Sequence, residues 1–323
     1  MLRLPVFTFH RPGTVDEAVE LLGELPEAML VAGGTDLLPN MKRKLFTPKD
    51  VIGIGHLPEL AGIQGTPDAG WRVGAGTLLE TVAEHEELPA ALRTAAASIS
   101  TPQLRNMGTL GGNLCLDTRC NYYNQSYFWR QALGFCMKKD ATICRVATSS
   151  PICLATYSAD TVPELGVLNA SIALRSTRGE REVRVADLYQ NDGMRFLRIE
   201  KDEVLTEVRI PPLDGLRSTY MKLRDRESFD FPIAGVAVGL RMDGLRVAEA
   251  RVSTTGIFSA PLRLTSVEEG LRGQELTRDV IEAAAGAGYR EVHPVDNTSG
   301  TIIQRKSTVR VFIRRALNEL AAR

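Results

Sequence analysis

The N-terminal part of the chain combines one helical pattern with short apolar runs that end in glycine. Thr14 and Glu17 are typical of a helix start, and Pro26 marks the end of that helix. The apolar positions between them recur at helical spacing: Val15, Ala18, Val19 and Leu22. Residues 29–32 and 51–55 are apolar runs that predict strands. This part of the chain therefore predicts a small α/β lobe.

Later patterns extend the prediction over most of the chain. After a glycine-rich segment at residues 71–76, residues 77–88 and 89–99 predict two helices. Strands are expected at residues 171–175, 182–185, 206–211, 218–224, 233–243 and 247–257. The remaining helical patterns cover residues 261–273, 278–292 and 301–323. Pro211 and Pro212 suit a domain boundary, so a smaller α+β domain is expected at the C-terminal end.

Length and composition are those of an ordinary soluble protein. A chain of 323 residues is longer than one core usually supports, so two domains or two lobes are expected. Because 39 Lys and Arg residues balance 39 Asp and Glu residues, no overall charge favours nucleic acid or a membrane surface as a partner. No apolar run approaches the roughly 20 residues of a membrane span. The N-terminus has no signal-peptide pattern, so a cytoplasmic location is expected.

Two glycine turns, AGGTDLLP at residues 32–39 and MGTLGGNLC at residues 107–115, share one physical property. Consecutive glycines permit positive φ and close backbone approach, so successive N–H groups can surround a phosphate. Two such turns suit a diphosphate, although any tight turn also selects glycine. The chain contains neither G-x-G-x-x-G nor a P-loop motif. A Rossmann dinucleotide site and a nucleoside triphosphatase are therefore disfavoured.

Together with STPQLRN at residues 100–106 and SADTVPELGVLNASI at residues 158–172, these turns resemble the FAD-binding subunits of the molybdenum hydroxylases, the family of xanthine dehydrogenase and CO dehydrogenase. The resemblance covers nearly the whole chain. It implies an α+β fold, with a two-lobed FAD-binding domain of the PCMH, or vanillyl-alcohol-oxidase-like, type and a smaller α+β domain after it. The expected bounds are residues 1–55 for the first lobe, 56–212 for the second lobe with a cysteine-rich insertion at about 117–154, and 213–323 for the C-terminal domain.

The resemblance also implies FAD contacts at individual residues. Thr101 falls where the family's chain lies beside the flavin, Asp160 where an acidic side chain binds ribityl or ribose hydroxyls, and Lys222 close to the flavin ring. From the residues alone, Asp160 could equally be a helix N-cap and Lys222 a solvated strand residue. The pyrophosphate contacts are expected from two loops: Val31, Ala32, Gly33, Gly34, Thr35, Asp36 and Leu37 in the first, and Thr109, Gly111, Gly112 and Asn113 in the second.

All five cysteines lie between residues 115 and 153, in a stretch without sustained periodicity. Their spacing matches neither a zinc ribbon nor a ferredoxin, so spacing alone names no metal. An odd number in a reducing compartment favours metal ligands or redox groups over disulfides, and inert core thiols remain an alternative. Cys115 belongs to the second glycine turn, where a small apolar residue packs equally well. The candidate ligands of one [4Fe–4S] cluster, with zinc as the alternative metal, are Cys120, Cys136, Cys144 and Cys153.

The insertion is also rich in basic and aromatic side chains. Cations near an anionic cluster would stabilise it or attract an acidic electron donor, although a solvated basic loop is an equally good interpretation. The aromatic side chains predict either a dry shell around a cluster or simply a small core for a long loop. The basic residues are Arg119, Arg130, Lys138, Lys139 and Arg145, and the aromatic residues are Tyr122, Tyr123, Tyr127, Phe128, Trp129 and Phe135.

With its four cysteines, the insertion resembles the FAD and iron–sulfur subunits of the 4-hydroxybenzoyl-CoA reductases, members of the family that work as reductases. This implies an oxidoreductase subunit that passes electrons from reduced ferredoxin through [4Fe–4S] and FAD. The implied partners are a small subunit with two [2Fe–2S] clusters and a large molybdopterin subunit that converts 4-hydroxybenzoyl-CoA to benzoyl-CoA, in a dimer of heterotrimers. Two other functions stay open: the FAD subunit of an oxidative molybdenum hydroxylase, and a zinc-stapled assembly subunit without catalysis.

Overall fold

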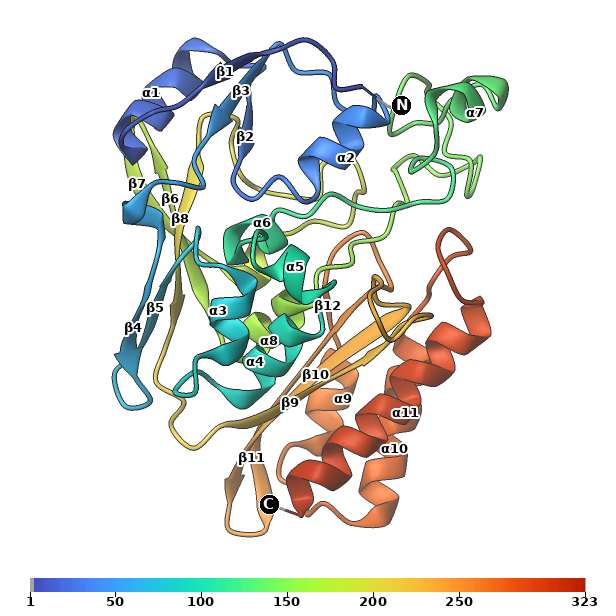
Figure 1. Ribbon diagram of the computed structural model, residues 1–323. Coiled ribbons are helices and arrows are strands. Elements are labelled where there is room, and N and C mark those ends of the chain that lie inside the picture. Colours follow the sequence, from blue (N-terminus) through green and yellow to red (C-terminus); the bar gives the residue numbers. More distant parts are fainter. Residues whose placement is uncertain (1–2, 323) are drawn as a thin grey trace.

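Three sheets organise the computed structural model, which describes residues 3–322 (Figure 1). The first sheet is parallel, in the order β1-β3-β2. As predicted, Thr14 caps the first helix, its hydroxyl accepting a hydrogen bond from the Glu17 N–H at 3.1 Å. The elements of this lobe are β1 (Thr8–His10), α1 (Val15–Glu24), β2 (Met29–Val31), α2 (Leu37–Lys42) and β3 (Asp50–Gly53). The predicted small α/β lobe is therefore confirmed.

The second lobe is built on an antiparallel sheet in the order β4-β5-β8-β6-β7. Its strands are β4 (Ile63–Thr66), β5 (Gly70–Gly74), β6 (Ser171–Ser176), β7 (Gly179–Arg184) and β8 (Val204–Ile210). Five short helices accompany them: α3 (Leu79–Glu84), α4 (Ala90–Ala97), α5 (Pro102–Arg105), α6 (Leu110–Leu114) and α8 (Thr161–Val167). The largest buried apolar cluster of the described chain lies in this lobe, around side chains such as Trp71, Leu110 and Leu165. Sequence periodicity missed α5 and α6 because each is shorter than two turns.

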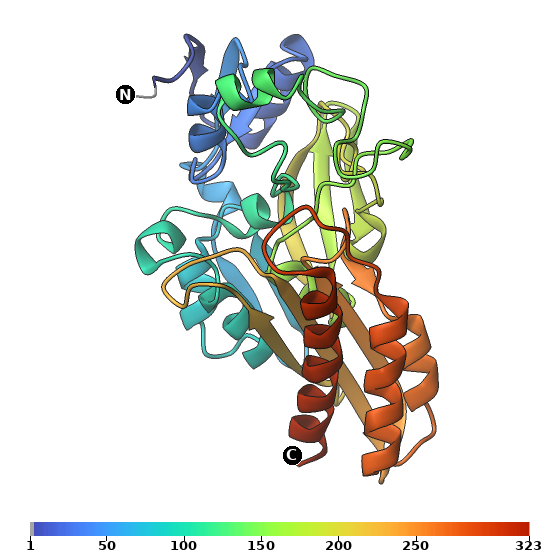
Figure 2. The same ribbon diagram turned by 90° about the vertical axis from the view of Figure 1, so that its right-hand side faces the viewer.

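The C-terminal domain places helices over one face of an antiparallel sheet, in the order β12-β11-β10-β9 (Figure 2). Its strands are β9 (Arg217–Leu223), β10 (Ala234–Asp243), β11 (Arg246–Thr255) and β12 (Leu262–Arg263), and its helices are α9 (Thr265–Leu271), α10 (Arg278–Glu291) and α11 (Ile302–Ala321). The helix predicted for residues 261–273 is wrong at its start. Leu262 instead pairs with Thr254 at the sheet edge, a tertiary contact that overrides the local pattern.

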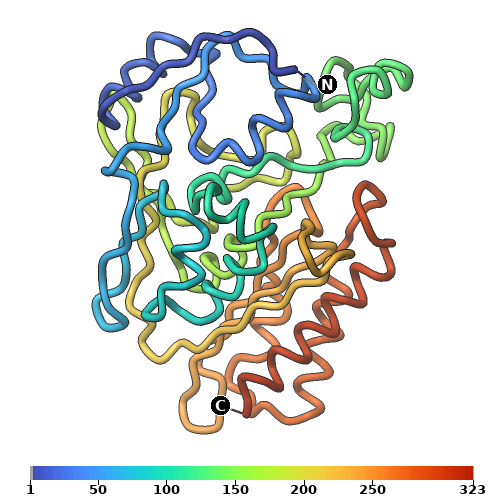
Figure 3. The backbone as a smooth tube through the Cα atoms, in the orientation of Figure 1, coloured from blue at the N-terminus to red at the C-terminus, as the bar shows by residue number. Residues whose placement is uncertain are grey.

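The cysteine-rich insertion, residues 117–154, is an irregular segment with one short helix, α7 (Tyr127–Ala132). In Figure 3 it is the green part of the tube beside the N-terminal lobe. Backbone hydrogen bonds of 2.7 Å in both directions between Arg119 and Thr156 close its base. It has a small apolar cluster of its own, which includes Leu45, Cys120, Tyr123, Cys136 and Cys153. The expectation of a core for this long loop is confirmed.

A loop of the C-terminal domain holds both ends of the insertion. The Asn121 N–H donates to the Asn297 carbonyl at 2.7 Å, and Asn297 Nδ2 donates to the Leu154 carbonyl at 2.5 Å. Buried Arg305 of α11 fixes this loop by donating to the Val295 carbonyl at 2.7 Å. The insertion is therefore anchored across a domain boundary.

Each of these three parts combines a sheet with helices, which confirms the α+β prediction. Among residues 3–322, no helix has both the length and the apolar character needed to cross a bilayer.

Candidate functional site

A cavity of about 640 Å³ lies between the N-terminal and second lobes, and both glycine turns line it. From the first turn it is lined by Val31, Ala32, Gly33, Gly34, Thr35, Asp36 and Leu37. From the second turn and α8 it is lined by Thr109, Gly112, Asn113 and Asp160. Within the described residues, three of the predicted contacts do not line it: Thr101, Gly111 and Lys222.

The two glycine turns pack directly against each other. A Cβ atom on Gly33 would lie 1.7 Å from the Met107 carbonyl oxygen, so only glycine fits there. Gly34 has a φ of 70°, in the left-handed region that favours glycine. On the second turn, the Thr109 hydroxyl accepts a hydrogen bond from the Gly112 N–H at 3.1 Å and caps α6. The turns thus form one continuous backbone surface, as the binding of a diphosphate requires.

Asp160 stands at the N-terminus of α8, but its side chain does not cap that helix. Its Oδ1 accepts a hydrogen bond from the Tyr220 hydroxyl at 2.8 Å, and its Oδ2 lies 3.0 Å from Lys222 Nζ. Lys222 Nζ also donates to the Ser98 carbonyl at 3.0 Å. Asp160 therefore occupies the N-cap position of α8 without a capping hydrogen bond from its side chain. The solvated position for Lys222 is wrong, because its side chain is only 5% exposed.

Burial controls the titration of this ion pair. It raises the pKa of Asp160 above its ordinary value, while the charge of Lys222 and the Tyr220 hydroxyl oppose the rise. Burial likewise lowers the pKa of Lys222, against the attraction of Asp160. Because both carboxylate oxygens already have protein partners, the network holds Asp160 in one orientation at the cavity wall.

Three other predicted contacts lie in the second glycine turn or shortly before it. Thr101 begins α5, and its hydroxyl caps that helix. A Cβ atom on Gly111 would lie 2.8 Å from the Cβ atom of Ala75, so glycine permits close packing there. Asn113 Oδ1 accepts a hydrogen bond from the Thr161 hydroxyl at 2.6 Å and ties the turn to α8.

The start of the insertion braces the first glycine turn. Arg119 pairs with Asp36, which also accepts a hydrogen bond from Asn40 Nδ2 at 3.1 Å. The Arg119 guanidinium lies 4.7 Å from the ring centroid of Phe231, a residue of the cavity lining. The structure therefore gives the carboxylate of Asp36 a partner within the protein.

Four of the cysteines lie buried within the insertion, as free thiols that are at most 7% exposed: Cys120, Cys136, Cys144 and Cys153. Burial, as the largest cause, raises the pKa of Cys120 to about 12, and the other three thiols raise it further by charge. The four sulfur atoms are therefore within electrostatic reach of one another. The backbone N–H groups of Tyr122 and Ala155 oppose the rise in the pKa of Cys120 and of Cys153, respectively.

A single-ion site is not formed by these thiols. Among residues 3–322, no three His, Cys, Asp or Glu side chains are arranged to hold one metal ion. The assignment of the four cysteines as ligands stays a prediction.

Cys115 lies apart from the other four. It lines the cavity and is open to it. Desolvation by the surrounding protein raises its pKa, without a contribution from another thiol. The structure therefore separates one cysteine of the glycine turn from four of the insertion.

Comparison with protein families assigns the chain to a family. The FAD-binding domain in molybdopterin dehydrogenase matches residues 5–213, and the CO dehydrogenase flavoprotein C-terminal domain matches residues 218–320. The chain belongs to the FAD-binding medium subunits of the molybdenum hydroxylase family. The predicted family and the binding of FAD are thereby confirmed.

Individual relatives of this FAD subunit align over nearly its full length. The medium chain of carbon monoxide dehydrogenase from Hydrogenophaga pseudoflava is 30% identical over 325 residues, covering 99% of this chain and 98% of the relative. The FAD-binding subunit of an aldehyde oxidoreductase from Escherichia coli K12 is 30% identical over 320 residues, covering 95% and 96%. A solved structure of the Hydrogenophaga pseudoflava carbon monoxide dehydrogenase matches with a TM-score of 0.80 at 27% identity, covering 98% and 97%. The fold prediction is confirmed by this match.

Several residues that line the cavity of the FAD subunit were missed by sequence reasoning: Asp117, Met194, Phe196, Arg226 and Phe231. Met194 and Phe196 lie in an irregular segment before β8, where no motif marks them. Asp117 is the first acidic residue after the second glycine turn, and that position was an available signal.

Two basic residues of the insertion are buried inside the FAD subunit. Arg130 is 1% exposed and donates to the Lys44 carbonyl at 3.2 Å. The side chain of Lys138 is 7% exposed, and its ammonium lies 2.7 Å from Asp117 Oδ1. The interpretation of the insertion as a solvated basic loop is therefore wrong for these two residues.

Proposed function

We propose that this chain is the FAD and iron–sulfur subunit of a 4-hydroxybenzoyl-CoA reductase, with a [4Fe–4S] cluster on Cys120, Cys136, Cys144 and Cys153. The observation that supports it is that four buried, free thiols lie in one segment beside this cavity, with three of them close enough to act by charge on Cys120. Cys153 marks this proximity, because a Cβ atom on Gly193 would lie 2.9 Å from its sulfur, while the next residue, Met194, lines the cavity.

The donor set suits an iron–sulfur cluster. Four thiolates complete one [4Fe–4S] cluster, and each binds a different iron atom, so they need not converge on a single point as the ligands of one zinc ion do. The backbone N–H groups of Tyr122 and Ala155 favour negative charge on the sulfurs of Cys120 and Cys153. Burial raises the pKa of Cys153 to about 11, and the charge of the Lys138 ammonium opposes this rise.

In the assembled enzyme this chain would hold the two groups at a fixed separation. When bound, FAD supplies a centre that exchanges electrons singly or in pairs, and the cluster supplies one that exchanges single electrons. The proposed partners are a large molybdopterin subunit and a small subunit with two [2Fe–2S] clusters, in a dimer of heterotrimers, with reduced ferredoxin as the electron donor. The proposed reaction removes the ring hydroxyl of 4-hydroxybenzoyl-CoA to give benzoyl-CoA.

A metal inventory of the anaerobically purified complex tests this function. Iron, acid-labile sulfide, zinc and FAD are measured, and EPR spectra are recorded after reduction. Cys120→Ala, Cys136→Ala, Cys144→Ala and Cys153→Ala should each remove about four irons per FAD and the [4Fe–4S] signal. Cys115→Ala is the matched control and should keep both. The intact complex should also reduce 4-hydroxybenzoyl-CoA with reduced ferredoxin.

Three results would overturn the proposal. Iron content unchanged in all four variants would leave the subunit without a cluster, as in an oxidative molybdenum hydroxylase. One zinc per FAD in place of iron would identify a zinc-stapled docking segment. A complete cluster without turnover of 4-hydroxybenzoyl-CoA would retain the electron-transfer subunit and reject the substrate.

A further inference from the structure

Asp36 brings a negative charge into the first glycine turn, where a diphosphate is expected. The residue lines the cavity, and its side chain is 33% exposed. The N–H groups of Thr35 and Asp36 make no hydrogen bond to a backbone carbonyl of the described chain, so they are open to an anion. An anion bound there would lie beside the carboxylate of Asp36, which would repel it. The turn is therefore suited to a phosphate only when another group balances that charge.

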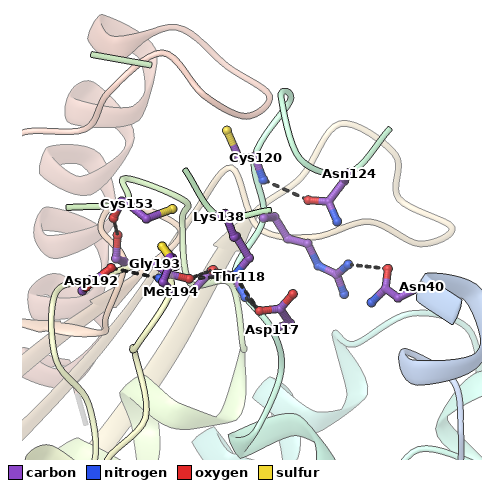
Figure 4. Close-up of polar contacts among 12 residues, drawn as sticks. Asn40, Asp117, Thr118, Cys120, Asn124, Lys138, Cys153, Asp192, Gly193 and Met194 are labelled. Carbon is purple, nitrogen blue, oxygen red and sulfur yellow. Dashed lines mark hydrogen bonds and ion pairs between the residues drawn. The ribbon is translucent and has the colours of Figure 1, made fainter. Parts of the chain in front are cut away.

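Arg119 of the insertion supplies the balancing charge. Its guanidinium pairs with Asp36 Oδ1, while Asp36 Oδ2 accepts a hydrogen bond from Asn40 Nδ2 at 3.1 Å, so both carboxylate oxygens have partners inside the protein. Arg119 Nη1 also lies 3.5 Å from Asn40 Oδ1, the contact drawn as the dashed line at Asn40 in Figure 4. The side chain of Arg119 is 11% exposed and does not line the cavity. Arg119 therefore acts on a ligand through Asp36 and not by direct contact.

The chain around Arg119 is held in place. Its backbone exchanges hydrogen bonds of 2.7 Å with Thr156 in both directions. The preceding residue, Thr118, accepts a hydrogen bond at its Oγ1 from Lys138 Nζ at 2.5 Å (Figure 4). The guanidinium also lies 4.7 Å from the ring centroid of Phe231, which lines the cavity. These contacts fix the positive charge beside the first glycine turn.

We propose that Arg119 is a positioning residue for FAD, which balances the charge of Asp36 and so lets the first glycine turn accept the pyrophosphate. Through this residue the insertion contributes to flavin binding, whether or not it carries iron. The proposal rests on the expected contact between the glycine turns and the pyrophosphate. When Arg119 is replaced, the unbalanced charge of Asp36 is what weakens FAD binding.

The dissociation constant of FAD for the flavin-depleted complex, measured by flavin fluorescence, tests this role. Arg119→Met should raise it about tenfold, because an unpaired carboxylate then faces the pyrophosphate. Asp36→Asn alone should not weaken binding, since it removes the repulsion. Adding Asp36→Asn to Arg119→Met should restore the affinity to within about threefold of wild type. If Arg119 has only a structural role, the double variant will bind FAD no better than Arg119→Met, and the proposal is overturned.

Two fragments of FAD and added salt separate repulsion from a structural defect. ADP carries the pyrophosphate and riboflavin has no phosphate, so Arg119→Met should weaken the binding of ADP and leave that of riboflavin unchanged. Raising the KCl concentration from about 0.05 to about 0.5 M should shrink the loss of FAD affinity, because salt screens the repulsion. Equal weakening of ADP and riboflavin would overturn the proposal.

Arg145→Met is the matched control within the insertion. Arg145 Nε donates to the Phe135 carbonyl at 2.8 Å, and its Nη2 donates to the Gly134 carbonyl at 3.1 Å, so these contacts lie inside the insertion. This variant should bind FAD as tightly as wild type. Equal losses of affinity in Arg145→Met and Arg119→Met would identify general damage to the insertion as the cause and reject the role of Asp36. Iron is measured on the same samples, so a complex without a cluster can still show the effect of Arg119.

Discussion

Replacing Lys222 by methionine tests the buried ion pair behind the FAD cavity. Lys222 Nζ lies 3.0 Å from Asp160 Oδ2, and the two side chains are 5% and 4% exposed. At an effective dielectric constant of about 20, unit charges at this distance attract each other by about 5 to 6 kcal/mol. Removing one partner of a buried pair usually costs about 3–5 kcal/mol because the other charge is left unpaired. We expect Lys222→Met to lower the free energy of unfolding by about 3 kcal/mol at about pH 8.

The size of this loss should depend on pH. Burial already raises the pKa of Asp160, and loss of the ammonium that opposes this effect raises it further. A carboxyl group with a raised pKa in the folded state contributes its full stability below its unfolded pKa and loses it as pH rises through the folded pKa. The difference in stability between Lys222→Met and wild type should therefore shrink as pH falls.

Urea unfolding followed by tryptophan fluorescence measures both effects, with free FAD held constant because bound ligand adds stability. Adding Asp160→Asn to Lys222→Met removes the unpaired charge and should recover much of the lost stability. Lys201→Met is the control, since Lys201 and Glu27 form a pair whose side chains are 75% and 86% exposed, and it should cause no measurable change. Additive effects of the Lys222 and Asp160 substitutions would refute the reasoning.

Two further predictions concern a glycine and a buried acid. Gly33→Ala should reduce FAD content at least tenfold, because the added Cβ would lie 1.7 Å from the Met107 carbonyl oxygen; Gly23→Ala, with its nearest neighbour 3.9 Å away, should keep its flavin. Equal flavin content in the two variants, measured by absorbance after gel filtration, would contradict this. Glu164 has a pKa raised by burial from 4.5 to about 8, so this residue alone should lower the free energy of unfolding by about 1.4 kcal/mol per pH unit as pH rises between these values. Glu164→Gln should flatten that slope in urea unfolding, and an unchanged slope would show that Glu164 is not its source.

Local patterns predicted the elements whose contacts are close in sequence. The helix expected at residues 301–323 is α11, which Thr301 caps by accepting a hydrogen bond from the Gln304 N–H. The sequence predicted the two glycine turns because the local backbone of each turn requires glycine. The edge strand β12 was not found, since only pairing with β11 determines it.

The sequence predicted the glycine turns of the candidate site but not the contacts between residues that are far apart in the chain. Asp117 and Lys138 are 21 positions apart in a stretch without periodicity, so no pattern joins them. The partner of Asp160 is 62 positions away, and only the family resemblance pointed to both residues. Cysteine spacing likewise could not show that four thiols are buried in the insertion, because irregular backbone, which has no periodicity, sets their positions.

The contacts of Asn297 limit the transfer of the insertion to another protein. Asn297 binds the backbone of Asn121 and of Leu154, at opposite ends of the insertion, from within the C-terminal domain. Transplanting residues 117–154 alone into a relative without this asparagine would leave the Leu154 carbonyl without its side-chain donor, and the Asn121 N–H would still need a backbone carbonyl in the place of that of Asn297. A working graft would have to carry the loop around Asn297 and its support, Arg305, as well. The closed base of the insertion therefore depends on residues more than a hundred positions away in the chain.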